Sequence, residues 1–156
     1  MHDGNVHAIA VHFGIKYENG LSEYLSGKLP IEQVIDKNVI ENLDVVTRGL
    51  IPPNPSELLM HSRLTEFLNW ANDNYNFVIV DTPPILAVTD ASIIASQSGT
   101  TLMVIKYDGN SVKEIEVANN RLNNDGIKVA GTILNMVEKT GSGHNPTFRS
   151  QFRNKP

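Results

Sequence analysis

The alternation of apolar and polar positions divides this chain into strand-like and helix-like stretches. The clearest strand-like stretch is 77–80, where the apolar run Phe-Val-Ile-Val leads into Asp81 and is ended by Pro83 and Pro84. A short apolar run bounded by turn signals is typical of a strand that is buried on both faces, as in a parallel sheet. Three more strands are predicted by similar runs at 43–47, 101–106 and 129–134. We therefore expect a sheet in which 77–80 is a central strand.

Between these runs, apolar residues recur at helical spacing. One stripe with a 3.6-residue period predicts a single helix from Ser56 to about Asn72. Its apolar positions are Leu58, Leu59, Leu64, Phe67, Leu68 and Ala71. Further helices are predicted over 21–25, over 31–35 and from Val112 to Asp125. Another helix is predicted to begin at Asp90, which would be its N-cap. Strands that alternate with helices in this way predict βαβ units with right-handed crossovers, and hence an α/β fold with a parallel sheet.

Composition narrows the class of protein. The chain has 156 residues, of which 40% are hydrophobic and 19% charged, so we expect one globular domain over 1–137. Residues 138–156 are polar and rich in Gly, Ser and Pro, which predicts a disordered tail. A net charge of -4 argues against a nucleic-acid partner. The chain has no cysteine, which fits the cytosol, and no apolar run near the roughly 18 residues of a membrane span.

Candidate chemistry centres on Asp81. Ligands of open α/β sheets bind beyond the carboxyl ends of the strands, where Asp81 is predicted to lie. A carboxylate at such a position can hold Mg²⁺, directly or through water, although an aspartate that caps the next turn fits the same pattern. His2, His7 and His12 recur at five-residue spacing, but without a carboxylate or cysteine scaffold we expect ordinary polar residues rather than a metal site.

Several segments resemble the cytoplasmic kinase domain of bacterial tyrosine kinases of the Wzc/Etk type, which are polysaccharide co-polymerases of capsule and exopolysaccharide export. The most specific are GLSEYLSGK (20–28), VVTRGLIPPNPSELLM (45–60) and YNFVIVDTPPILAVTDA (75–91). The resemblance continues through GTTLMVIKY (99–107) and EVANNRLNNDGIKVAGTILN (116–135). It implies a three-layer parallel sheet of the deviant P-loop NTPase type, similar to partitioning ATPases, on the cytoplasmic side of the inner membrane.

The resemblance also implies roles for individual residues. Asp81 corresponds to the Walker B aspartate, which helps to hold the Mg²⁺ that bridges the phosphates of ATP. Asn135 ends the last predicted strand, where related nucleotide-binding domains contact the base; a turn asparagine is the alternative. Arg48 follows a strand and either faces phosphate or is a solvated loop residue.

The chain departs from the family pattern at the phosphate site. It contains no Gly-Lys-Ser/Thr, because its one Gly-Lys pair, Gly27-Lys28, is followed by Leu29. Its start, Met-His-Asp-Gly, resembles the segment that follows the aspartate-rich strand of the family, and no tyrosine follows Tyr107. We therefore expect a C-terminal part of a kinase domain that lacks the P-loop strand and the acidic strand after it. On this basis the chain alone should bind neither ATP nor Mg²⁺ and should show little or no catalysis.

Three functions remain as hypotheses. The first is a truncated tyrosine-kinase domain whose family role is ATP-dependent tyrosine autophosphorylation in capsular and exopolysaccharide biosynthesis. The second is a non-catalytic interaction module that binds a full-length tyrosine kinase or another polysaccharide export protein. The third is a fragment of a partitioning-type ATPase, against which the PPNPSELL segment argues. In each case the missing strands should leave a gap beside the Asp81 strand, which predicts marginal stability and self-association.

Overall fold

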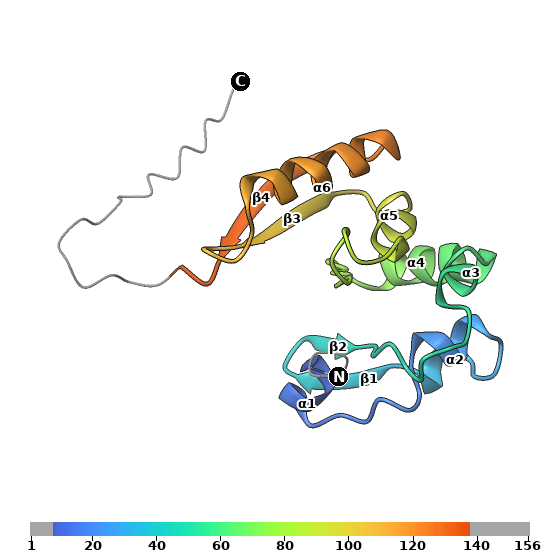
Figure 1. The fold of residues 1–156 in the computed structure, drawn as a ribbon. Helices are drawn as coiled ribbons and strands as arrows, with labels where there is room; N and C mark the ends of the chain where they lie inside the picture. The colour runs from blue at the N-terminus through green and yellow to red at the C-terminus, as the bar shows by residue number, and fades with distance from the viewer. Residues whose placement is uncertain (1–7, 138–156) are drawn as a thin grey trace, which may run out of the picture.

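The computed structural model describes residues 8–137, so the predicted tail and two of the three histidines, His2 and His7, lie outside the described residues. An N-terminal group contains α1 (Ala8–Phe13), α2 (Leu21–Leu25), the 3-10 helix η1 (Ile31–Gln33), β1 (Asp36–Ile40) and β2 (Leu43–Val45). It lies beneath α3 (Pro55–Leu59), α4 (Ser62–Asn74) and α5 (Asp90–Ala95) in Figure 1. The chain then continues through β3 (Thr101–Lys106), α6 (Val112–Asn124) and β4 (Val129–Asn135).

The C-terminal elements form the βαβ unit that the sequence predicts. β3 and β4 pair in parallel, from Thr101 opposite Val129 to Lys106 opposite Asn135, and α6 lies along them. The capping box of α6 explains where the helix begins: Ser111 Oγ accepts a hydrogen bond from Glu114 N, and Glu114 Oε2 accepts one from Ser111 N. Gly126 has φ +75°, a left-handed conformation that favours glycine and ends the helix.

The second sheet is an antiparallel hairpin of β1 and β2. The predicted strand at 43–47 is confirmed over Leu43–Val45, but its partner was not predicted. Residues 31–35 were expected to form a helix, whereas only Ile31–Gln33 forms a short 3-10 turn before β1 begins. Asn42 adopts φ +62° between the two strands, a conformation that asparagine tolerates better than most residues. The hairpin therefore follows from local turn chemistry that the apolar pattern does not reveal.

The helix predicted from Ser56 to Asn72 is two helices, α3 and α4. The break falls at His61, whose Nδ1 accepts a hydrogen bond from Arg63 N and so caps α4. The predicted apolar stripe is confirmed within α4, where Leu64, Phe67 and Ala71 are buried. Pro52 and Pro53 lie outside regular structure, but α3 begins at Pro55, one residue before the predicted start at Ser56.

The buried core joins the N-terminal group to the helices above it. Its members come from α2, the end of η1, α4 and α5, and Leu64 and Val34 are the most deeply buried large side chains. The cluster consists of Tyr24, Leu25, Val34, Leu64, Phe67 and Ile94. The core therefore lies away from the β3–β4 pair, and the α4 stripe supplies its centre.

The apolar run 77–80 is the main correction to the predicted fold. It was expected to be a central strand buried on both faces, but the structure assigns it to no strand and Figure 1 draws no arrow there. Phe77 is 90% exposed and Ile79 is 92% exposed. A parallel strand is stabilised by neighbours on its edges and faces. In the described part of the chain, the sheets are the pairs β1–β2 and β3–β4, and neither includes this run. Within residues 8–137, parallel pairing is therefore limited to β3 and β4.

Candidate functional site

Asp81 lies at the end of the exposed run, where its carboxylate is open to solvent. Within the described residues it forms no hydrogen bond or ion pair, so no cap or neighbouring cation occupies its oxygens. It makes no hydrogen bond to Asn135 or to the loop after Val46. Asp81 is therefore free to accept a ligand, and its role in holding Mg²⁺ stays a prediction.

Two hydrogen bonds fix the chain on either side of Asp81. Before it, Tyr75 Oη donates to Asp44 Oδ2 over 2.6 Å, which ties the end of α4 to β2. After it, Arg121 Nη1 donates to the carbonyl oxygen of Ile85 over 2.7 Å, which ties the following loop to α6. Between these anchors, residues 76–83 make no hydrogen bond within the described structure. The run and Asp81 are thus held at their ends and left open along their length.

The Tyr75–Asp44 hydrogen bond changes the acidity of both groups. Its phenol donates to a carboxylate, so the hydrogen bond and the nearby negative charge raise the pKa of Tyr75 to about 12. The same hydrogen bond, together with the one from Asn38 N to Asp44 Oδ1, lowers the pKa of Asp44. The pair therefore holds an ionised aspartate and a neutral tyrosine at ordinary pH.

Another hydrogen bond joins the PPNPSELL segment, which precedes Asp81 in the sequence, to the VTDA segment, which follows it. Ser56 Oγ, in α3, donates to Asp90 Oδ1, in α5, over 2.9 Å. Asp90 was predicted to be the N-cap of α5, but Thr89 occupies that position and the Asp90 carboxylate instead binds α3. The PPNPSELL and VTDA segments are thus packed together, a relationship that sequence spacing alone does not show.

The loop after β2 packs closely against the start of α2. Leu21 N donates to Thr47 O, and Ser22 N donates to Arg48 O. A side chain at Gly20 would overlap the backbone nitrogen of Gly49, so the two backbones are in contact. The buried carboxylate of Glu23 accepts from Gly20 N over 3.0 Å, which closes the arrangement.

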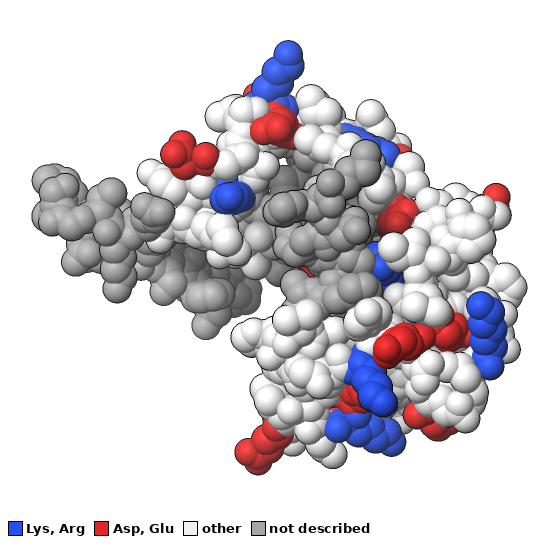
Figure 2. All heavy atoms as spheres, turned by 60° about the horizontal axis from the view of Figure 1, so that its bottom comes forward, with Lys and Arg blue, Asp and Glu red and all other residues white. Residues whose placement is uncertain are grey.

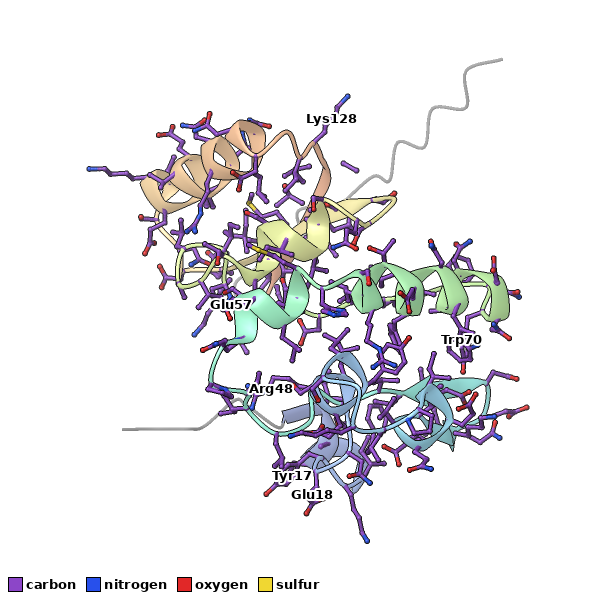
Figure 3. The ribbon with its side chains drawn as sticks, turned by 90° about the vertical axis from the view of Figure 1, so that its right-hand side faces the viewer. Tyr17, Glu18, Arg48, Glu57, Trp70 and Lys128 are labelled. Carbon is purple, nitrogen blue, oxygen red and sulfur yellow. The ribbon has the colours of Figure 1, made fainter. Side chains whose placement is uncertain are left out.

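The side chain of Arg48 is exposed on this loop, on the same side of the molecule as Glu57 in Figure 3. It makes no hydrogen bond or ion pair to any residue that the structure describes. A hollow of about 480 Å³ lies nearby, and its ionisable lining residues are Glu23, Lys28, Glu57 and His61. Asp81 does not line it, so the hollow is separate from the predicted Mg²⁺ position. Its mixed charges are unlike a cationic phosphate cradle.

Asn135 sits at the end of β4. Its side-chain Oδ1 accepts from Met136 N over 2.8 Å, and its carbonyl oxygen accepts from Tyr107 N. This is the geometry of a turn asparagine, which was the alternative to a base contact. A contact between Asn135 and a nucleotide base stays a prediction.

No group of three or more His, Cys, Asp or Glu side chains in the described residues is arranged to hold a metal ion. Figure 2 shows basic and acidic side chains interspersed on the face it presents. Among the described helices, none is both long enough and apolar enough to cross a membrane.

Comparison with known proteins gives a consistent result. A putative tyrosine-protein kinase in the cps region of Klebsiella pneumoniae is 51% identical over 127 residues, which is 81% of this chain and 18% of that protein. Tyrosine-protein kinase etk of Escherichia coli K12 is 48% identical over 130 residues, or 83% of this chain and 18% of that protein. No protein-family model matches the chain. The chain thus spans about a fifth of the length of these curated relatives.

The solved kinase domain of Escherichia coli tyrosine kinase ETK has a similar fold. It superposes with a TM-score of 0.82 at 45% identity, and the match covers 88% of this chain and 54% of that domain. The resemblance inferred from the motifs is therefore confirmed. The relatives are tyrosine kinases, which favours this reading over a partitioning-type ATPase.

Proposed function

This chain belongs to the Wzc/Etk-type bacterial tyrosine kinases, and from that premise we propose that it supplies the Walker B part of a kinase domain. The proposal includes a fold of the deviant P-loop NTPase type, a location on the cytoplasmic side of the inner membrane and a role in capsular or exopolysaccharide biosynthesis. In this role Asp81 helps to hold the Mg²⁺ of bound ATP. The observation that carries the proposal is the open carboxylate of Asp81 on a segment anchored at both ends.

The residues of this chain do not by themselves fit ATP and Mg²⁺. Asp81 offers one carboxylate, whereas Mg²⁺ in such sites also relies on the phosphates of the nucleotide and on a loop that holds them. The sequence has no Gly-Lys-Ser/Thr to supply that loop. In this proposal, Asp81 therefore acts in phosphoryl transfer only as part of a complete kinase domain.

A chimeric kinase domain tests the proposal. In it, residues 8–137 of this chain replace the matching part of the Escherichia coli ETK kinase domain, and autophosphorylation is measured with radiolabelled ATP. The chimera should be active, and Asp81→Asn should lower its rate by about 100-fold or more because charge neutralisation dominates phosphoryl transfer. Asp73→Asn is the matched control, since Asp73 is an exposed aspartate near the end of α4. An Asp81→Asn chimera as active as the control would contradict the proposal.

The non-catalytic interaction module is retained as a second candidate because the apolar run 77–80 is exposed. In that case the chain binds a partner while the Asp81→Asn substitution has no effect on the partner's activity.

A further inference from the structure

The tyrosines of the chain differ in how accessible their hydroxyl groups are. The sequence has four of them, at positions 17, 24, 75 and 107, and all four lie within the described residues. Tyr24 is 8% exposed and belongs to the core, where its ring contacts Phe67 and lies under the guanidinium of Arg63. An enzyme that acts on a tyrosine hydroxyl would have to disturb this packing, so Tyr24 is a poor acceptor in the folded chain.

Tyr75 is half-buried, and its hydroxyl is already engaged. It donates to Asp44 Oδ2 over 2.6 Å, and the hydrogen bond to this carboxylate raises the pKa of Tyr75 to about 12. Addition of a phosphoryl group would break this hydrogen bond and place a phosphate against an aspartate, which like-charge repulsion opposes. Tyr75 is therefore also a poor acceptor.

Tyr107 has the most accessible hydroxyl of the four. Its side chain is 50% exposed, compared with 38% for Tyr17, and its hydroxyl makes no hydrogen bond to any residue that the structure describes. The phenolic oxygen can therefore react with an incoming group without the loss of an interaction inside the chain.

The backbone holds Tyr107 in a defined place, at the end of β3 and on the turn that leads into α6 (Figure 1). Tyr107 N donates to Asn135 O over 2.8 Å, which ties the residue to the end of β4. On the two sides of it, Lys106 N donates to Asn110 Oδ1 over 2.8 Å, and Asp108 adopts φ +51°. A side chain on an anchored turn loses less conformational freedom on entering an active site than one on a free segment does.

We propose that Tyr107 is a phosphorylation site, to which a separate kinase molecule of the Wzc/Etk type transfers the γ-phosphoryl group of ATP. The phenolic oxygen attacks the γ-phosphorus and forms a new P–O bond, while the bond from that phosphorus to the β,γ-bridging oxygen breaks. ADP leaves with both electrons of the broken bond, and the phenolic proton passes to solvent. The proposal rests on the proposed function in its choice of kinase, because that kinase comes from the family to which the chain belongs.

Phosphorylation by a second molecule tests the proposal. The full 156-residue chain is incubated with the Escherichia coli ETK kinase domain, Mg²⁺ and radiolabelled ATP, and the phosphorylated peptides are identified by mass spectrometry. A tyrosine-containing copolymer in parallel reactions shows that the kinase is active. We expect phosphate on Tyr107, and Tyr107→Phe should lower incorporation by about tenfold or more, because transfer requires a hydroxyl that can reach the γ-phosphorus. The substitution keeps the ring and removes a hydroxyl that makes no hydrogen bond to the described residues, so the fold should be unchanged.

Tyr17→Phe is the matched control, because Tyr17 is the other tyrosine with a partly exposed side chain. Incorporation should be the same in this variant as in the native chain, and Tyr75→Phe should give the same result. Circular dichroism and thermal unfolding confirm that each variant keeps its fold. The proposal is overturned if the folded chain takes up no phosphate, if most of the phosphate is on Tyr17, Tyr24 or Tyr75, or if Tyr107→Phe takes up as much as the native chain.

Failure of this proposal and failure of the proposed function give different results, because ETK supplies the catalytic site in this assay. Phosphate on Tyr107 together with an inactive chimeric kinase domain would support the phosphorylation site and contradict the proposed function. An active chimera together with an unphosphorylated Tyr107 would overturn the phosphorylation site and support the proposed function.

Discussion

Tyr75 donates a 2.6 Å hydrogen bond to Asp44 and thereby joins the residue two positions before the exposed run to the N-terminal hairpin. Replacing Tyr75 with Phe removes the donor and should lower the free energy of unfolding by about 1–2 kcal/mol, the usual range for a partly exposed hydrogen bond to a charged group. Urea denaturation monitored by circular dichroism measures this. Tyr107→Phe is the control, because Tyr107 is half-exposed and its hydroxyl makes no hydrogen bond to the described residues. An equal decrease in the free energy of unfolding for Tyr75→Phe and Tyr107→Phe would contradict a stabilising Tyr75–Asp44 hydrogen bond.

The contribution of Tyr75 to stability should depend on pH in a defined direction. The pKa of Tyr75 is raised from 10.0 to about 12 in the folded state, so its contribution is complete below pH 10.0 and disappears as pH rises toward about 12. The pKa of Asp44 is lowered from 3.8, so its contribution is complete above pH 3.8 and disappears as pH falls through the lower folded value. The difference in urea midpoint between the native chain and Tyr75→Phe should be constant from pH 6 to 9 and shrink above pH 10.0. A difference that grows above pH 10.0 would show the opposite linkage.

Gly49 should not tolerate a side chain. Its φ is +82°, and a Cβ there would meet the carboxylate of Glu23, which is needed to accept from Gly20 N. Gly49→Ala should lower the free energy of unfolding by about 2–4 kcal/mol, from left-handed strain and a disturbed buried hydrogen bond. Gly126→Ala is the matched control, since Gly126 has φ +75° but no atom within 4 Å of the added Cβ. It should cost about 1–2 kcal/mol. Indistinguishable urea curves for the two variants would exclude the clash with Glu23.

The hydrogen bond that Arg121 donates should stabilise the loop after Asp81 against local opening. Arg121→Met removes the hydrogen bond to Ile85 O, while the stem of the side chain can still pack. We expect the amide of Ala87, which donates to Pro84 O in this loop, to exchange about tenfold faster, because one charge-assisted hydrogen bond opposes local opening. Lys113→Met, an exposed position on the same helix, should leave this exchange unchanged. Hydrogen exchange with mass spectrometry resolves the difference.

The isolated chain should not bind ATP. Asp81 is one carboxylate, and the sequence has no phosphate loop to hold the nucleotide around it. Calorimetry with ATP and Mg²⁺ should show no binding heat beyond dilution. A Kd of about 1 μM would reveal a phosphate site made by other residues. Arg48 would then be the first residue to mutate, because its exposed side chain makes no hydrogen bond to the described residues.

The βαβ unit at 101–135 was predictable because its information is local. An alternating strand, a capping box, a helical stripe and a glycine stop fall in sequence order, and β3, α6 and β4 begin within one residue of the predictions. The hairpin was not predictable in the same way, because β1 has few apolar residues and depends on the conformation of Asn42.

The structure of the run 77–80 could not be predicted from its local sequence. Its composition predicts a buried central strand, which the structure does not form, because strand pairing and burial depend on partners that the apolar pattern of one chain does not reveal. At the candidate site, Asp81 was predicted from its position after the run, and its role stays a prediction. The hydrogen bonds of Arg121 and Ser56 were not found, because each spans more than 30 residues of sequence. The sequence signal for the Ser56–Asp90 contact was that these residues belong to two of the three most specific segments, 45–60 and 75–91.

The exposed side chains of Phe77 and Ile79 should shorten the lifetime of the chain in a cell. An extended apolar segment open to solvent is the feature that chaperones and quality-control proteases detect in unfinished proteins. Any change that lowers the exposure of Phe77 and Ile79 should therefore lengthen the time that a copy of the chain survives.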